Sequence, residues 1–283
     1  MSASEAVLPP GLRLGAVHLT VADLDRSLGY YRDRLGLRVH RREDAVAALG
    51  TGEHDVVLLH EEPGARPAGR HAGLFHYALL FPSREELARA LGRLAASRTP
   101  LTGASDHGVS EALYLRDPDG HGIELYADRP PQAWPPPQQR GDRVGMFTRA
   151  LDLDDLIATI AGEEPAAHPQ PGLRMGHVHL QVGDLGAARG FYVDVLGLEP
   201  TVASYPGAMF LAAGGYHHHV GINTWAGEGI GPAPPGTARL REWTLVLEAD
   251  AIAALRRRIA AAGIRGEDGD VVADPWGIAV RFG

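Results

Sequence analysis

Three side chains that can bind a metal recur at matching places of a repeated pattern. His177 lies in an alternating apolar stretch, seven positions before Asp184, and His76 lies in a similar stretch, seven positions before Ser83. Asp and Ser are typical helix N-caps, so both histidines are expected at the same point of a strand that leads into a helix. Together with Glu124 from a third apolar stretch, they would form a facial triad, which leaves positions open on a non-haem iron.

Each of these residues has a simpler explanation when it is taken alone. A single strand histidine is more often a hydrogen-bonded core or rim residue. A single strand glutamate more often faces solvent. The case for a metal therefore depends on three such residues at equivalent positions of one pattern.

The sequence contains an internal duplication. Residues 11–39 (GLRLGAVHLTVADLDRSLGYYRDRLGLRV) reappear without a gap as residues 172–200 (GLRMGHVHLQVGDLGAARGFYVDVLGLEP). Each copy must be one supersecondary unit that packs against others. Ala16 stands in the first copy where His177 stands in the second, which indicates that one copy keeps chemistry that the other lacks.

The whole chain divides into four units of one strand, one helix and three strands. The first unit has predicted strands at 12–21, 37–40, 45–49 and 55–60 and a helix at 24–35; the second has strands at 74–81, 112–115 and 122–126 and a helix that begins at Ser83. The third unit repeats the first, and the fourth, with strand 243–247, helix 250–262 and strand 278–282, repeats the second. The predicted fold class is α+β, with four βαβββ modules in two tandem halves.

The predicted halves are residues 1–128 and 172–283, joined by a Pro-rich linker at residues 129–171. In the fourth unit, Trp243 aligns with His76 and Arg281 aligns with Glu124. A complete triad therefore requires the second and third units to face each other, within one chain or across a dimer. The first and fourth units would then form a metal-free cup with Ala16, Trp243 and Arg281.

Composition limits the class of protein. The chain of 283 residues has a formal net charge of −8 and no cysteine, so a metal must be held by histidine and carboxylates. The sequence has no sustained block of Lys and Arg. Nucleic acid or an anionic membrane surface is therefore not expected as the main partner. No apolar run reaches the roughly 20 residues of a membrane span, and the N-terminus does not resemble a signal peptide, so a cytoplasmic location is expected.

Several motifs together resemble a known family. The stretches GHVHLQVGDL and FYVDVLGL within 176–198, the run DHGVSEALYLRDPDGHGIELYADRP at 106–130 and YHHHVGINTWAG at 216–227 are similar to the vicinal oxygen chelate superfamily, which has the glyoxalase/bleomycin resistance/extradiol dioxygenase fold. Within it, the chain resembles the type I extradiol ring-cleavage dioxygenases of the catechol 2,3-dioxygenase kind. The resemblance implies an oxidoreductase of aromatic hydrocarbon catabolism that inserts O₂ into a catechol-type substrate.

The same resemblance implies roles for individual residues. It makes His76, His177 and Glu124 ligands of Fe(II) or Mn(II), and it implies catalytic roles for His219 and Tyr114. His219 also follows from the repeat, because it lies four residues after Gly215 as Glu124 lies four residues after Gly120, and it would fill the fourth corner of the metal cup. The alternatives are a structural histidine in the run 217–219 and a core tyrosine.

Other residues are expected around the substrate. His179 and His107 are candidate substrate-binding groups, and Trp134, Trp225 and Tyr205 lie near Pro/Gly loops where they would close the pocket or simply pack. Competing functions are a metal-dependent isomerase or lyase of the glyoxalase type, a thiol transferase that acts on an antibiotic, and a metal-free drug-binding protein. A homodimer or higher homo-oligomer is a further expectation, and the sequence leaves open the choice of catechol.

Overall fold

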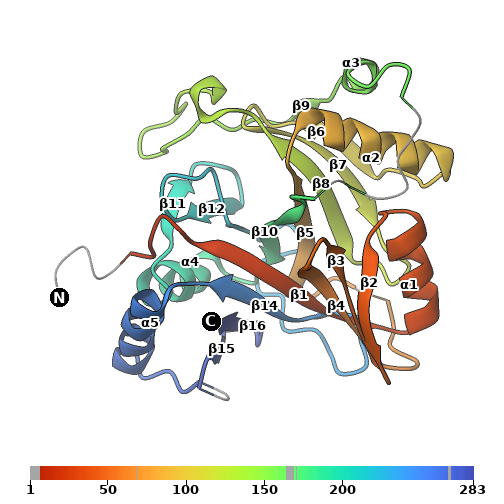
Figure 1. Cartoon of the computed structure of the whole chain (residues 1–283). Coiled ribbons are helices and arrows are strands. Elements are labelled where there is room, and N and C mark those ends of the chain that lie inside the picture. Colours follow the sequence, from red (N-terminus) through yellow and green to blue (C-terminus); the bar gives the residue numbers. More distant parts are fainter. Residues whose placement is uncertain (1–6, 68, 164–168, 170, 267–268) are drawn as a thin grey trace.

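Two mixed β-sheets form the framework of the protein in the computed structural model (Figure 1), which describes residues 7–67, 69–163, 169, 171–266 and 269–283. The strand order is β15-β16-β14-β1-β4-β3-β2 in the seven-stranded sheet and β11-β12-β13-β10-β5-β8-β7-β6-β9 in the nine-stranded sheet. Each sheet takes one unit from each half of the chain.

The elements of the seven-stranded sheet are β1 (Arg13–Val21), β2 (Arg38–Glu43), β3 (Val46–Thr51), β4 (His54–Glu61), β14 (Leu240–Val246), β15 (Val271–Ala273) and β16 (Ala279–Phe282). Those of the nine-stranded sheet are β5 (Gly73–Phe81), β6 (Gly103–Asp106), β7 (Ser110–Arg116), β8 (Gly122–Asp128), β9 (Arg149–Ala150), β10 (Arg174–Gln181), β11 (Glu199–Val202), β12 (Ala208–Ala212) and β13 (Val220–Asn223). The helices are α1 (Leu24–Asp33), α2 (Arg84–Ala96), α3 (Leu153–Ala158), α4 (Leu185–Arg189), α5 (Ala249–Ala261), the 3₁₀ turn η2 (Pro131–Ala133) and the π-helical turn η3 (Gly190–Val195).

The predicted contact between the second and third units is confirmed. β5 of the second unit pairs antiparallel with β10 of the third, and β1 of the first unit pairs antiparallel with β14 of the fourth. Both contacts occur within one chain, so a partner subunit is not required to bring the second and third units together.

Two equivalent tyrosines join the units of each half in a second way. The hydroxyl of Tyr31 on α1 donates to Asp117 at 2.9 Å, and that of Tyr192 on η3 donates to Asp274 at 2.9 Å. The other oxygen of each aspartate accepts backbone N–H groups of its own turn. The units of a half are therefore tied through a helix and a turn, while the sheets join units of different halves.

The predicted modules are confirmed, and the ends of the elements agree closely. The strand expected at 12–21 is Arg13–Val21, and the helix expected from Ser83 begins at Arg84, with the Ser83 hydroxyl accepting the N–H of Glu86 at 3.3 Å. The segment 129–171 contains structure that its Pro-rich sequence did not predict. Its strand β9 pairs with β6 at Ser105 and Ala150 and extends the nine-stranded sheet.

One hydrophobic core serves both sheets. Its buried members include Val17 on β1, Tyr77 on β5 and Val178 on β10.

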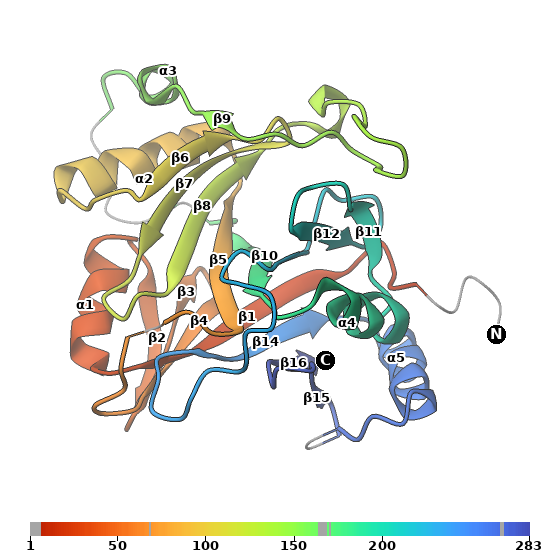
Figure 2. The same cartoon turned by 180° about the vertical axis from the view of Figure 1, so that it is seen from behind.

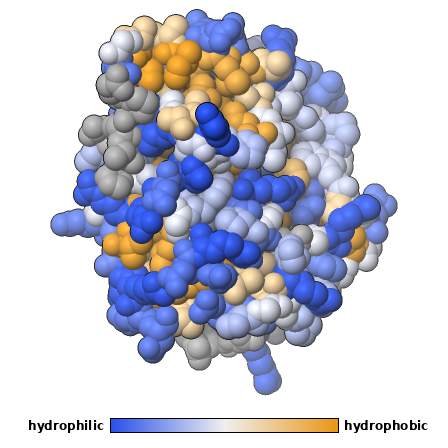
Figure 3. Space-filling view, turned by 90° about the vertical axis from the view of Figure 1, so that its right-hand side faces the viewer, coloured by the Kyte–Doolittle hydropathy of each residue, from blue (hydrophilic) through white to orange (hydrophobic). Residues whose placement is uncertain are grey.

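Helices α1 and α2 lie at one end of the molecule and α4 and α5 at the other (Figures 1 and 2). Figure 3 shows the side where α1 and α2 lie, which is mostly hydrophilic with a hydrophobic patch near its top. Among the helices that the structure describes, none is long and apolar enough to cross a membrane.

Candidate active site

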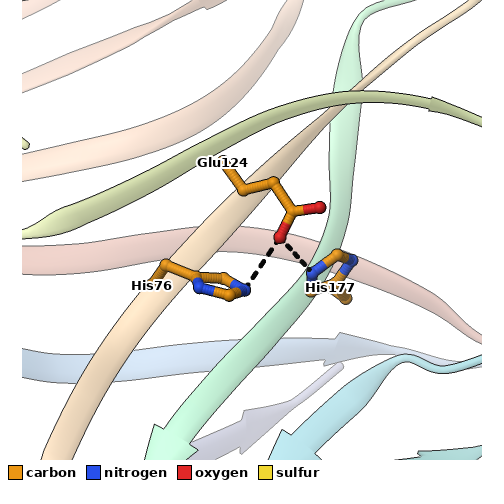
Figure 4. Close-up of side chains that lie close together, drawn as sticks. All are labelled: His76, Glu124 and His177. Atoms are coloured by element: carbon orange, nitrogen blue, oxygen red, sulfur yellow. Dashed lines mark hydrogen bonds and ion pairs between the residues drawn. The ribbon is translucent and has the colours of Figure 1, made fainter. Parts of the chain in front are cut away.

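Three neighbouring strands of the nine-stranded sheet bring His76, Glu124 and His177 together (Figure 4). Oε2 of Glu124 lies 2.9 Å from Nε2 of His76 and 3.1 Å from Nε2 of His177. β5 lies between β10 and β8, and its Ala78, two residues after His76, is the register partner of both His177 and Glu124. The three residues predicted as ligands therefore meet at one point, although they are up to 101 positions apart in the sequence.

This group has the properties of a metal site. All three residues are buried, and their candidate ligand atoms lie within 4.8 Å of one another. Nε2 of His76 is buried without a hydrogen-bond partner among the described residues, although it is close to the carboxylate. A bound cation would satisfy this nitrogen and the shared carboxylate oxygen together, and two imidazoles with one carboxylate suit a non-haem iron site.

The electrostatics of the group favour the protonation states that ligands need. Burial alone would raise the pKa of Glu124, but the charges of His177 and His76, with the hydrogen bond of His177, outweigh burial and hold this pKa well below its usual range. Burial lowers the pKa of His177, against the opposing effect of Glu124. An ionised carboxylate and an unprotonated imidazole are the forms that bind metals.

The triad opens into a cavity of about 460 Å³. Phe75, Phe147, Tyr205, Phe210 and Trp225 supply aromatic surface to its wall. Glu124 is the one carboxylate among the described residues that line it. The cavity is therefore suited to a flat, largely apolar molecule that presents polar groups to the triad.

Three further predicted residues also line this cavity. Tyr114 lies beside His76, with ring centroids 5.6 Å apart, and its hydroxyl is 2.7 Å from Nε2 of His107. Burial, followed by the charge of Glu124, raises the pKa of Tyr114 well above its usual value, so its hydroxyl keeps its proton. His179 is buried between Phe75 and Phe210, and its Nε2 has no hydrogen-bond partner among the described residues.

The structure does not place His219 at the fourth corner of the cup. His219 is absent from the described residues that line the cavity, and its Nδ1 accepts the backbone N–H of Ala213 at 3.3 Å. Its neighbour His218 lines the cavity instead, with its ring centroid 4.1 Å from that of His177. The member of the histidine run that lines the cavity is therefore His218, and the catalytic role expected for His219 stays a prediction.

The strand register explains why His219 does not lie at the position equivalent to Glu124. Ile123 is the partner of Tyr77, and Val220 is the partner of Val178, so Gly221 corresponds to Glu124. A Cβ at Gly221 would lie 2.8 Å from the ring of His179, so glycine makes room for that imidazole. The spacing of four residues after Gly120 and after Gly215 does not identify equivalent positions, because the turns before β8 and β13 differ in length.

The register also corrects the predicted composition of the metal-free cup. Val17 pairs with Trp243 and His18 with Glu242, as Val178 pairs with Tyr77 and His179 with His76. Glu242, and not Trp243, therefore corresponds to His76. Trp243 is fully buried in the core, whereas Arg281 does correspond to Glu124, as predicted.

The predicted aromatic residues divide into two groups. Trp225 and Tyr205 line the cavity. Trp134 packs instead against His217, with ring centroids 5.4 Å apart. Phe75, Phe210 and Phe147 were not predicted, because single phenylalanines in apolar strands and loops carry no signal that separates a pocket wall from ordinary core.

Sequence comparison places the chain among known proteins. The model of the Glyoxalase/Bleomycin resistance protein/Dioxygenase superfamily matches residues 13–125 and 174–282. A catechol-2,3-dioxygenase of Bacillus subtilis is 43% identical over 242 residues, which cover 83% of this chain and 82% of that protein. A biphenyl-2,3-diol 1,2-dioxygenase of Rhodococcus globerulus is 33% identical over 120 residues, which cover 41% of this chain and 63% of that protein.

Solved structures agree at the level of the fold. A protein described as a putative dioxygenase from Bacillus subtilis has a TM-score of 0.61 at 13% identity, over 98% of this chain and 86% of its own. Glyoxalase I from Zea mays has a TM-score of 0.58 at 18% identity, over 96% of this chain and 92% of its own. With matches to both halves and a relative of 43% identity over most of its length, the chain belongs to the Glyoxalase/Bleomycin resistance protein/Dioxygenase superfamily.

Proposed function

We propose that this protein is an extradiol dioxygenase that cleaves a catechol-type ring with O₂ at a mononuclear metal held by His76, Glu124 and His177. The observation that carries the proposal is the convergence of these buried side chains at the aromatic-walled cavity. The 43% identity to a catechol-2,3-dioxygenase over most of both chains supports the same reaction. A metal ion, when bound there, supplies open coordination positions for both catechol oxygens and for O₂.

Iron(II) is the metal that the donor set favours, and manganese(II) is the alternative. Two imidazole nitrogens and one carboxylate oxygen form the facial triad that is typical of non-haem iron oxygenases. The chain has no cysteine, so thiolate ligands do not compete for the ion.

His218 is the side chain best placed to accept a proton from the substrate. Nε2 of His217 is 2.8 Å from a carboxylate oxygen of Asp128, and Nδ1 of His217 is 2.8 Å from Nδ1 of His218. The carboxylate must accept the Nε2 proton of His217, so Nδ1 of His217 accepts in turn from Nδ1 of His218. This assignment leaves Nε2 of His218 as an acceptor, without a proton of its own.

The electrostatic environment of His218 sets its protonation state. Burial, followed by the nearby His177 and His217, lowers the pKa of His218 well below its usual value. The imidazole is therefore unprotonated at neutral pH and able to take up a proton when catechol ionises. Asp128 and His217 act as positioning residues, because they fix which nitrogen of His218 carries the proton.

Tyr114 and His107 form a second polar pair in the cavity. Nδ1 of His107 is 2.9 Å from the carbonyl oxygen of Phe147, so it carries the proton, and Nε2 then accepts the hydroxyl proton of Tyr114. The pair holds the tyrosine hydroxyl near the triad. We assign Tyr114 and His107, together with His179, to the binding and orientation of substrate.

The test is a turnover experiment on purified protein loaded with Fe(II) under anaerobic conditions. Added catechol should consume one O₂ per molecule, and with ¹⁸O₂ the product should carry both labelled atoms, because a dioxygenase transfers both. A parallel sample loaded with Mn(II) compares the two metals. Conversion of a hemithioacetal without O₂ uptake would instead favour the glyoxalase-type isomerase.

A further inference from the structure

A second cavity lies in the seven-stranded sheet, at the place equivalent to the active site. Its volume is about 580 Å³, and β1, β4, β14 and β16 contribute to its wall. Its polar lining consists of His18, His60, Arg239, Arg241, Glu242 and Arg281. Among the described residues, His76, Glu124 and His177 form the group of three close metal-binding side chains, and none of these three lines the second cavity.

The same strand irregularity shapes both cavities. His179 pairs with His76 and Leu180 with Leu74, so Phe75 has no partner across the strand pair. In the other sheet His18 pairs with Glu242 and Leu19 with Leu240, so Arg241 is the extra residue. Such a bulge turns the side chain of the extra residue away from the regular alternation.

The two bulged residues give the cavities opposite chemistry. Phe75 contributes an aromatic residue to the wall of the first cavity, whereas Arg241, an exposed arginine, contributes a cationic residue to the wall of the second. The metal-site positions differ in the same sense, since Arg281 stands in place of Glu124. The first cavity suits a neutral ring, and the second suits a negatively charged group.

The positive charge of the second cavity is only partly neutralised. Arg281 is paired with Glu242, at 2.6 and 2.9 Å, and Arg239 lies 3.5 Å from Glu62. The side chain of Arg241 has no hydrogen bond or ion pair with any residue in the described part of the chain. The lining of the second cavity thus contains three arginines and one carboxylate, that of Glu242, in a chain whose formal net charge is −8.

We propose that this second cavity is a binding site for a small oxyanion, a carboxylate or a phosphate group, with Arg241 as its principal contact. A guanidinium group matches the two oxygens of such an anion with two parallel N–H donors. The imidazoles of His18 and His60, whose nitrogens are 3.2 Å apart, supply further polar contacts beside it. Trp276, which lines the same cavity and is partly buried, offers a flat surface for the organic part of a carboxylate ligand.

Isothermal titration calorimetry of the metal-loaded protein tests the proposal with three probes. Benzoate represents an organic carboxylate, inorganic phosphate represents the free anion, and benzamide is the uncharged counterpart of benzoate. We expect saturable binding of benzoate, phosphate or both, and no binding of benzamide at equal concentration. Benzoate alone would identify a carboxylate site, and phosphate alone would identify a phosphate site.

Substitutions locate the binding. Arg241→Gln should weaken binding by at least about tenfold, because a charge-assisted bidentate contact is lost. Arg38→Gln is the matched control, because Arg38 is an exposed arginine on β2, outside this cavity, and it should leave binding unchanged. Arg281→Gln should also weaken binding, because it leaves the carboxylate of Glu242 facing the anion.

Two outcomes would overturn the proposal. One is the absence of any saturable binding of benzoate and phosphate to the wild-type protein. The other is binding that Arg241→Gln leaves unchanged, which would place the anion elsewhere, for example in the first cavity. The site does not depend on the proposed dioxygenase activity, so catechol turnover is measured separately on the same samples.

Discussion

Arg281 and Glu242 form a two-point ion pair at the positions that correspond to Glu124 and His76 in the other sheet. Each sheet thus carries a close contact between a carboxylate and a basic side chain at this place. In the nine-stranded sheet the basic group is an imidazole, which has a lone pair to donate to a metal. In the seven-stranded sheet it is a guanidinium, which has no acceptor nitrogen and is not a metal ligand.

This difference predicts one metal ion per chain. Glu124→Ala should lose stoichiometric iron or manganese, because two imidazoles alone hold a labile divalent ion weakly. Glu242→Ala, the matched control in the other sheet, should keep the metal. Elemental analysis of the purified proteins measures both, and two tightly bound ions per wild-type chain would contradict the register-based equivalence.

Substitution of the adjacent histidines separates their roles. His218→Gln should keep the metal and lower the rate of ring cleavage by roughly 10²–10⁴, the usual contribution of a positioned proton-transfer group. His219→Gln should change the rate only slightly, since His219 does not line the cavity among the described residues. Single-turnover kinetics with a preformed catechol complex measure the step, and the reverse order of effects would restore His219 as the catalytic residue.

The hydrogen bond between Asp128 and His217 predicts a smaller, indirect effect. Asp128→Asn can donate to Nε2 of His217 and reverse its tautomer, so that Nε2 of His218 acquires the proton. We expect kcat to fall while KM for catechol changes little, and the pH profile to shift. Asp128→Glu should recover part of the loss. An unchanged pH profile in Asp128→Asn would indicate that the contact is only structural.

Much of the fold and the triad could be predicted from the sequence, for a physical reason. The duplication fixes equivalent positions, and strand alternation then places residues two apart on one face. His76, His177 and Glu124 were found because each has a recognisable distance to a helix cap or a turn. The contact of the second and third units followed from the requirement for one complete ligand set.

The remaining site residues depend on the pairing register of the strands, which the sequence of the short turns between them does not reveal. His179 pairs with His76 and His18 pairs with Glu242, so the counterpart of His76 is Glu242 and not Trp243. The unknown strand register also explains why His219 was predicted to fill the fourth corner of the metal cup. A one-residue change of register moves a side chain to the other face of the sheet, so such errors exchange core and cavity residues.

Gly221 tests how tightly the cavity wall is packed. Gly221→Ala should displace the ring of His179, because the new Cβ would lie 2.8 Å from it, and should destabilise the protein by about 1–3 kcal/mol. Gly190→Ala is the control, because a Cβ there meets nothing within 4 Å. Denaturant unfolding of both variants measures the difference. Equal stability of the two would show that His179 moves without cost.

The pH dependence of stability provides a test of the buried His219. Burial, followed by the charges of His217 and His177, lowers the pKa of His219 to about 4 from the ordinary value of 6.5. The unfolded chain therefore binds a proton at this residue between pH 6.5 and about 4 that the folded chain does not bind. The stabilising effect is complete above pH 6.5 and is lost as the pH falls toward 4.

His219→Gln removes this titration. The free energy of unfolding of the wild type should therefore fall by about 2 kcal/mol more than that of the variant between pH 7 and pH 5. Denaturant titrations at both pH values, with identical metal loading, give the four free energies that are needed. Parallel losses of stability in the two proteins would mean that His219 becomes protonated as readily in the folded chain as in the unfolded chain, which its burial and its contact with the N–H of Ala213 oppose.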